Sequence, residues 1–200
     1  KAALSAYLKY SFVPTPLSIY DNFYKLEPGH LMEVSLDDFN RGVDKFKSYP
    51  YWDLISITEE NLASEFKGSL KSAISKTDDL LQESVDLRTI SDVPVGTFLS
   101  GGIDSSLISS IASHLSSTKI QTFSVGFNEE EFNEAKEAKE ISDYLSTDHY
   151  EIKVSEKDLL DDFPYIATVY DEPFADSSQL PTYLISKFAK QNVSVVLSGD

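Results

Sequence analysis

Residues 97–106 read TFLSGGIDSS, an apolar run that ends in Ser-Gly-Gly and continues into an aspartate and two serines. Two adjacent glycines let the backbone turn tightly with its amides facing inward. A helix that begins just after them points its positive end at the same spot, where an anion is stabilised. The pattern therefore predicts an anion cradle made by Ser100, Gly101, Gly102, Ser105 and Ser106.

Asp104 lies in the middle of this cradle. A carboxylate repels an anion, but its oxygens are ligands that Mg²⁺ prefers, so we expect Asp104 to hold Mg²⁺ that bridges phosphate groups. An ordinary turn between a strand and a helix does not require this aspartate and two glycines together. The chain contains neither GxxxxGK[ST] nor GxGxxG, which disfavours Walker-type phosphate transfer and dinucleotide binding.

The composition of the chain limits its partners. It has 33 acidic and 17 basic residues, and its net charge is −16. This charge repels phosphate backbones and anionic lipids, so we expect neither nucleic acid nor a membrane surface as a partner. The absence of cysteine excludes disulfides, thiolate metal sites and a cysteine nucleophile. It also fits a reducing compartment, and we expect a cytoplasmic protein.

Short apolar strands alternate with amphipathic helices in the second half of the chain. The expected strands cover residues 95–99, 120–125, 149–154 and 193–197, and the expected helices cover 105–116, 131–145, 156–170 and 179–190. This order is typical of an α/β fold, a parallel sheet with helices on both faces. Ligands bind such sheets at the carboxyl ends of the strands, where we expect Gly101, Gly102, Gly126 and Gly199.

The first part of the chain has a different pattern. A helix is expected over residues 2–10, and a proline-rich extended segment follows it. Residues 1–56 are therefore predicted to form an arm, and residues 57–200 the α/β domain. A helix is expected to start at Thr58 and to carry one apolar face of Leu62, Phe66, Leu70, Ala73 and Ile74. The polar stretch 76–90 is expected to be a surface loop that is in part helical.

The sequence S-G-G-x-D-S after an apolar strand resembles the pyrophosphate loop of the PP-loop ATP pyrophosphatases, which cleave ATP between its α- and β-phosphates. The longer stretch SDVPVGTFLSGGIDSSLIS (91–109) resembles the synthetase domain of glutamine-hydrolysing asparagine synthetases. Further similar segments are residues 7–30, TFSVGF (122–127), DEPFADSSQLPTYLIS (171–186) and VVLSGD (195–200). The resemblance implies an adenine nucleotide alpha hydrolase-like fold and covers most of the chain.

The resemblance also implies roles for particular residues. The cradle residues and Asp104 would surround the phosphates that leave as pyrophosphate. The adenosine would be bordered by Leu99, Val125 and Gly126, mainly through backbone atoms. Ser198, Gly199 and Asp200 would approach the nucleotide from a later strand. Asp104 and Asp200 would be the catalytic and metal-binding carboxylates.

The reaction implied by the resemblance joins ammonia to a carboxylate. The carboxylate of aspartate would attack ATP to form an acyl-adenylate, and ammonia, supplied from glutamine by a separate glutaminase domain, would release AMP and form asparagine. The resemblance leaves a homodimer open. Three alternatives also remain open: a sugar-acid amidotransferase, a β-lactam synthetase in which the adenylate is captured intramolecularly, and a nucleotide-binding module without catalysis.

Two features of the chain depart from the family pattern. About 15 residues separate Ile74 from Ser91, where the family has a short connection containing an arginine; Arg88 is the only basic residue near that place. The chain also begins at Lys1 and stops within the SG[DE]G.DE motif, so we expect a fragment truncated at its carboxyl end, with little or no synthetase activity. Packing and ligand contact explain DVPVG (92–96) equally well. The acidic residues Asp171, Glu172 and Asp176 fit loop charges and a substrate pocket equally well.

Overall fold

The computed structural model describes residues 1–42, 47–127 and 134–199. The described chain divides into two compact units. The arm unit comprises residues 1–67 and 167–176, and the sheet unit comprises residues 68–166 and 177–200. In the described residues no helix combines the length and the apolar composition needed to cross a membrane.

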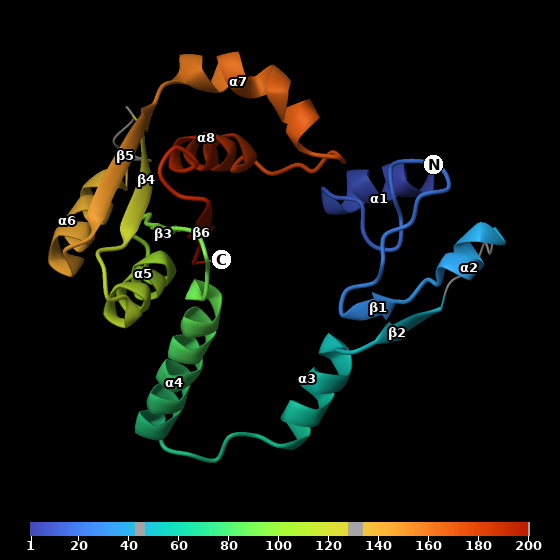
Figure 1. The fold of residues 1–200 in the computed structure, drawn as a ribbon, viewed down its shortest axis with the longest axis horizontal. Coiled ribbons are helices and arrows are strands. Elements are labelled where there is room, and N and C mark those ends of the chain that lie inside the picture. The colour runs from blue at the N-terminus through green and yellow to red at the C-terminus, as the bar shows by residue number, and fades with distance from the viewer. Residues whose placement is uncertain (43–46, 128–133, 200) are drawn as a thin grey trace. The chain divides into compact units, whose positions relative to one another are not determined.

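The sheet unit is built on four parallel strands in the order β5-β4-β3-β6 (Figure 1). Their bounds are β3 Val95–Phe98, β4 Gln121–Phe127, β5 Asp148–Val154 and β6 Val195–Leu197. The chain adds strands on one side of β3 and then crosses to the other side to form β6. The strand order therefore reverses between β3 and β6, and this is the place where open α/β sheets bind ligands.

Helices cover both faces of this sheet, as the sequence predicts. The helices of the sheet unit are α4 Leu70–Thr89, α5 Ile103–Leu115, α6 Ala135–Leu145, α7 Glu156–Val169, whose last residues belong to the arm unit, and α8 Gln179–Ala189. One face packs against α5 and α6, with α4 lying against α5, and the other face packs against α8. The α/β fold with a parallel sheet is therefore confirmed.

Side chains of β4 point alternately to the two faces of the sheet. Phe123 is fully buried with Ile185 and Ala189 of α8, and its ring stacks on Tyr150 with centroids 5.4 Å apart. Thr122 and Ser124, which point to the opposite face as strand geometry requires, are also buried. The strand is therefore apolar toward α8 and polar toward α6.

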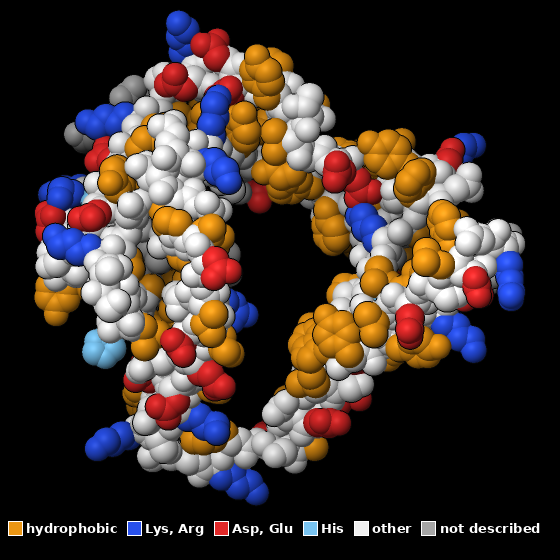
Figure 2. Space-filling view, viewed as in Figure 1, with side chains coloured by type: hydrophobic (Ala, Val, Ile, Leu, Met, Phe, Trp, Pro, Cys, Tyr) orange, Lys and Arg blue, Asp and Glu red, His pale blue; other side chains and the backbone are white. Residues whose placement is uncertain are grey.

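The arm unit contains short elements and few buried residues. Its elements are α1 Ala2–Tyr10, β1 His30–Met32, α2 Leu36–Asn40, β2 Ser48–Pro50 and α3 Leu54–Ala63, and β1 pairs antiparallel with β2. Many of its large apolar side chains are exposed, including Leu36 and Tyr24, and Figure 2 shows apolar side chains on the surface of the chain.

A later segment of the chain belongs to the arm unit. Glu172 forms an ion pair with Lys25 and accepts a hydrogen bond of 2.8 Å from the backbone N–H of Ile19. The N–H of Ala175 donates to the carbonyl of Ser11 at 2.7 Å. Burial raises the pKa of the Glu172 carboxyl, but hydrogen bonds from Lys25, Ile19 and Ser18 and the positive charge of Lys25 outweigh it and lower the pKa below its usual value. Glu172 therefore holds two stretches of the arm unit together.

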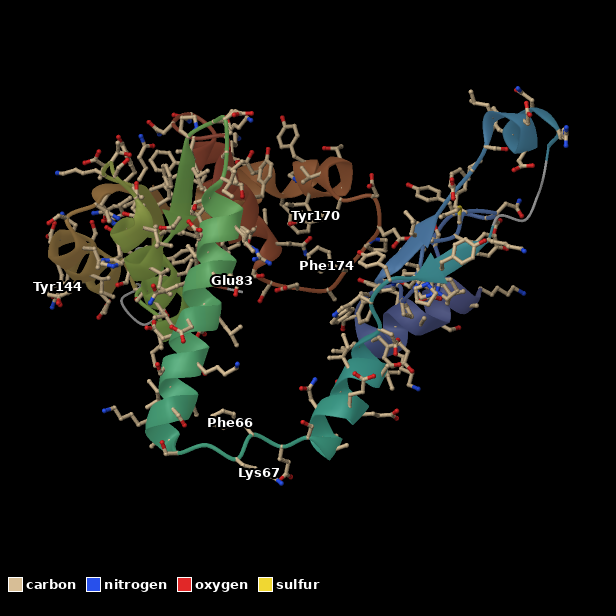
Figure 3. All side chains as sticks on the ribbon, turned by 60° about the horizontal axis from the view of Figure 1, so that its bottom comes forward. Phe66, Lys67, Glu83, Tyr144, Tyr170 and Phe174 are labelled. Carbon is tan, nitrogen blue, oxygen red and sulfur yellow. The ribbon has the colours of Figure 1, made fainter. Side chains whose placement is uncertain are left out.

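The expected helix from Thr58 to Ile74 is wrong. The structure has two helices, α3 and α4, separated by an irregular segment in which Figure 3 places Phe66 and Lys67. The capping residues explain the boundaries: Asp53 accepts from the N–H of Ser56 at 2.8 Å, and Ser69 accepts from the N–H of Ser72 at 3.2 Å. A side chain that satisfies a free amide at this position starts a helix.

The expected surface loop at 76–90 is also wrong, because α4 continues to Thr89. Leu81 and Val85, four residues apart, lie on one helix face and pack against Ile111 and Ala112 of α5. Arg88 lies in the last turn and donates to the carbonyl of Ser84 at 2.9 Å. The residues between Ile74 and Ser91 are thus mainly the second half of a helix that packs on the sheet unit.

Smaller differences concern element ends. Helix α5 begins at Ile103 rather than at residue 105. Gly126 lies within β4, which continues to Phe127, and so does not follow the strand as expected. The described part of α6 begins at Ala135, and the first residues of the expected helix 131–145 lie outside the described residues.

Candidate functional site

A pocket opens at the carboxyl ends of β3, β4 and β6. Its cavity volume is about 470 Å³, which lies within the range of small-molecule sites. Residues from the β3–α5 loop, from β4 and from the end of β6 form its wall, and α8 closes one side. The pocket therefore occupies the point of strand reversal in the sheet unit.

Most of the residues proposed from the sequence border this pocket. They are Leu99, Ser100, Gly102, Asp104, Ser105, Val125, Ser198 and Gly199. Gly101, Ser106 and Gly126 do not border it, and Asp200 lies outside the described residues. Three segments far apart in the sequence thus meet at one cavity, while the ligand roles of these residues remain predictions.

The β3–α5 loop owes its shape to its glycines and serines. Gly101 has a φ of +85°, which an L side chain rarely adopts. The hydroxyl of Ser105 lies 2.9 Å from that of Ser100 and accepts from the N–H of Ser100 at 3.2 Å. Ser106 donates to the carbonyl of Gly102 at 2.5 Å. The hydroxyl of Ser106 is therefore engaged by the first turn of α5, and Ser106 does not border the pocket.

Helix α5 presents its amino end to the pocket. Gly102 is its N-cap and has no side chain with which to cap the first turn, and its own N–H donates to Oγ of Ser100 at 3.3 Å. The amides of a first helical turn have no partners within the helix. Together with the helix dipole, these donors stabilise an anion. The pocket lining includes no lysine or arginine among the described residues, so the positive potential comes from the backbone.

The end of β6 approaches α5 closely. A Cβ added to Gly199 would lie 2.6 Å from the backbone nitrogen of Ser105 and 2.9 Å from the carbonyl carbon of Asp104. Only a residue without a side chain allows this contact. Glycine therefore brings the end of β6 directly against the cradle.

One half of the pocket is apolar, and sequence reasoning missed most of it. Phe98, Phe123, Phe127, Pro181 and Ile185 border this half. Their flat and aliphatic surfaces suit a planar aromatic base. The alternation of β4 could have indicated that Phe123 and Val125 share a face. The residues of α8 could not have been placed, because the helix register over the sheet depends on packing.

Three further polar residues border the pocket. They are Ser124 of β4, Glu134, which precedes α6, and Thr182 of α8. The backbone of Glu134 also lies near the cradle, because a Cβ on Gly101 would be 3.3 Å from its carbonyl oxygen.

The residues fit Mg²⁺ only in part. Asp104 supplies a carboxylate at the pocket, and carboxylate oxygens suit this ion. Within residues 1–42, 47–127 and 134–199, however, no group of three or more His, Asp or Glu could hold a metal. Mg²⁺ commonly keeps water and phosphate ligands, so one or two protein carboxylates suffice when a polyphosphate is bound.

Gly101→Ala is expected to destabilise the chain by about 1–3 kcal/mol, because alanine resists a positive φ and packs poorly there. The new Cβ would lie 2.8 Å from the Cβ of Glu137. Urea unfolding of the chain measures the effect. Gly102→Ala is the matched control, since its Cβ would meet only the hydroxyl of Ser100, at 3.3 Å. Equal stability of the two variants would contradict the role assigned to the left-handed turn.

Comparison with known proteins assigns the chain to a family. The family model described as asparagine synthase matches residues 76–200, which include α5, the β3–α5 loop and the end of β6. The chain belongs to the asparagine synthase family. The matched region includes every residue proposed from the sequence for the pocket, although the match itself assigns no role to any of them.

Relatives of this asparagine synthase family chain support the assignment. The asparagine synthetase (glutamine-hydrolysing) 1 of Bacillus subtilis is 35% identical over 100% of the chain and 29% of its own length. The asparagine synthetase (glutamine-hydrolysing) of Zea mays is 36% identical over 61% of the chain and 22% of its own length. The chain thus spans less than a third of either relative. Asparagine synthetases of this kind are ligases.

A solved structure was also found to be similar. The NH3-dependent NAD synthetase from Campylobacter jejuni is 17% identical to the chain, with a TM-score of 0.43 over 66% of the chain and 57% of the solved one.

Proposed function

We propose that this chain forms the nucleotide-binding part of a synthetase that activates a carboxylate with ATP, and that the carboxylate is aspartate. The observation that carries the proposal is the pocket itself. It joins the amino end of α5, a glycine-serine loop and one aspartate at the point of strand reversal. The membership in the asparagine synthase family favours aspartate as the acceptor of ammonia.

The two halves of the pocket suit the two halves of ATP. The β- and γ-phosphates would lie at the amino end of α5, where backbone amides donate to anions. The adenosine would lie between Phe98, Val125 and Ile185 in the apolar half. A net charge of −16 and a pocket lining whose described residues include no lysine or arginine explain why amides and a divalent cation must neutralise the phosphates.

The proposed reaction has two steps. A carboxylate oxygen of aspartate attacks the α-phosphorus of ATP, the bond from that phosphorus to the bridging oxygen breaks, and pyrophosphate leaves. Ammonia then attacks the acyl carbon, AMP leaves and a proton is released, which gives asparagine. The amides of the cradle stabilise the charge that grows on pyrophosphate. Mg²⁺, held by Asp104 and Asp200, would supply further charge neutralisation when bound with ATP.

Glutamine is the proposed source of ammonia, because the curated relatives are named glutamine-hydrolysing. The present chain contains no cysteine, so a cysteine-dependent glutaminase step cannot take place on it. We therefore propose that a separate glutaminase domain supplies the ammonia, and that the chain alone has little synthetase activity. A cytoplasmic location and a homodimer remain part of the proposal.

Exchange of labelled pyrophosphate into ATP tests this function. The full-length protein should catalyse exchange only when a carboxylate substrate is present, since exchange requires reversible adenylation. A panel containing aspartate, sugar acids and β-amino acids identifies the substrate. We expect exchange with aspartate. Exchange with another carboxylate alone would support a related amidating or cyclising enzyme, and MgATP binding without any exchange would contradict the adenylation proposal.

A further inference from the structure

Helix α4 has a second apolar side besides the one that packs on α5. Leu81 and Val85 belong to the apolar cluster that includes α5. Leu70, Leu80 and Leu87 lie outside that cluster and are exposed, Leu70 at 78% and Leu87 at 61%. The steps of ten and seven residues between these three leucines place them along one side of a helix. This side of α4 is therefore apolar and open to solvent in the described sheet unit.

The exposed leucines belong to a regular repeat, which we name the α4 seam. Its members follow one another at alternating steps of three and four residues, and they are Leu70, Ala73, Thr77, Leu80, Ser84 and Leu87. Such a repeat averages 3.5 residues per turn, the spacing with which one helix packs along another. Leucines occupy both ends of the seam, and the small residues between them let a second helix approach closely. The seam is therefore suited to a partner helix.

The charges of α4 are ordered along the helix. Residues 70–77 contain Lys71 and Lys76 and no acidic residue, whereas residues 78–87 contain four acidic residues and no basic one. The helix dipole favours acidic side chains in the first turn, so it does not account for a lysine there. An antiparallel second α4 does account for this order, because it brings the basic half of each helix against the acidic half of the other.

Two of these charges adjoin the seam on the same edge. Lys76 directly precedes Thr77 and Glu83 directly precedes Ser84, and both charged side chains are exposed on α4 (Figure 3). They are about 10 Å apart along the helix axis, too far to pair with each other. Neither belongs to an ion pair among the residues that the structure describes. Charges beside a seam pair with those of the facing helix, and both are free to do so.

We propose that the α4 seam is a dimer interface, on which a second copy of this protein packs its own α4 in the antiparallel direction. Leu70 of one copy then packs on Leu87 of the other, and Lys76 pairs with Glu83. Each contact occurs twice, since a two-fold dimer uses the same patch of both copies. A parallel pair would place Lys76 against Lys76 and Glu83 against Glu83. The inference rests on the homodimer included in the proposed function and gives that homodimer a surface.

Sedimentation equilibrium of the full-length protein over a range of concentrations tests the interface. Lys76→Glu and Glu83→Lys, each alone, place like charges against each other at both contacts, so each should raise the dimer Kd about tenfold or more. Lys71→Glu is the matched control, because it makes the same change of charge on α4 at an exposed position outside the seam. Its dimer Kd should equal that of the unmodified protein, and circular dichroism should show the same helix content in all variants.

Mixing the two weakened variants separates contacts between copies from contacts within one copy. A heterodimer of Lys76→Glu with Glu83→Lys again places opposite charges at both contacts, so the mixture should associate about as tightly as the unmodified protein. The double variant Lys76→Glu/Glu83→Lys should regain association for the same reason. A contact inside one copy cannot produce recovery on mixing. A mixture that associates no more tightly than either variant alone would overturn the antiparallel interface.

Pyrophosphate exchange in the same samples keeps this inference separate from the proposed adenylation. No residue of α4 borders the described pocket, so the variants should exchange pyrophosphate as the unmodified protein does. A monomeric full-length protein that exchanges pyrophosphate would overturn the interface and leave adenylation intact. A dimer whose Kd responds to none of the seam variants would also overturn it, and another part of the same protein would then cover the seam. A dimer that responds as expected but shows no exchange would support the interface and contradict adenylation.

Discussion

Asp104→Asn in the full-length protein is expected to reduce aspartate-dependent pyrophosphate exchange by about a hundredfold or more, the scale for loss of a group that stabilises transition-state charge. Asparagine keeps the shape of the side chain and removes the negative charge that Mg²⁺ requires. Asp104 is exposed at the start of α5, so its loss should not disturb the core. The exchange rate and the thermal unfolding temperature, measured in parallel, check both statements.

The matched control for this variant is Asp86→Asn. Asp86 is an exposed aspartate on α4 that does not border the pocket. The pyrophosphate exchange rate of Asp86→Asn should equal that of the unmodified protein, because the same charge is removed at a distance from the site. Full exchange activity in Asp104→Asn would exclude Asp104 from metal binding. A matching loss in Asp86→Asn would point to an effect of total charge.

Gly199→Ala is expected to abolish MgATP binding to the chain and to destabilise it by about 1–3 kcal/mol, the usual result of forcing atoms into a packed contact. The added methyl group would lie 2.6 Å from the backbone nitrogen of Ser105. Backbone cannot swing aside as a flexible side chain can, so the end of β6 or the first turn of α5 must move. Calorimetric MgATP titration and urea unfolding measure the two effects.

Gly42→Ala is the control for this substitution. Gly42 has a φ of +66°, and a Cβ there would have no neighbour within 4 Å. The free energy of unfolding of this variant should therefore fall only by the roughly 1 kcal/mol that a left-handed backbone costs an alanine. Its MgATP affinity should be unchanged. Unchanged nucleotide binding in Gly199→Ala would show that close approach of β6 is not needed for the site.

Much of the sheet could be predicted from the sequence because its signals are local. The strands of the sheet unit are short apolar runs between helices with clear amphipathic periods. The SGGIDSS loop places glycines for a turn, serines at a helix start and one carboxylate within seven residues. The meeting of Ser100 with Gly199 at one pocket also followed from topology, since carboxyl ends of parallel strands share one edge.

The errors arose where tertiary packing or capping decides the structure. The part of α4 after Ile74 was not predicted, because the helix exposes most of its residues and buries only Val85 fully, so its apolar stripe is narrow. The start of α3 depends on the Asp53 side chain, not on Thr58. The contributions of α8 and Ser124 to the pocket depend on register and on contacts between distant segments, which a single sequence does not encode locally.

The ion pair between Lys25 and Glu172 joins two parts of the arm unit that lie far apart in the sequence. Residues 167–176 are synthesised long after the arm, yet they complete it, and they are flanked on both sides by residues of the sheet unit. Excising the sheet unit by cutting at Gly68 would therefore leave Glu172 and Ala175 without the groups that they bind. Any dissection of this protein into separately expressed parts has to treat the arm as discontinuous.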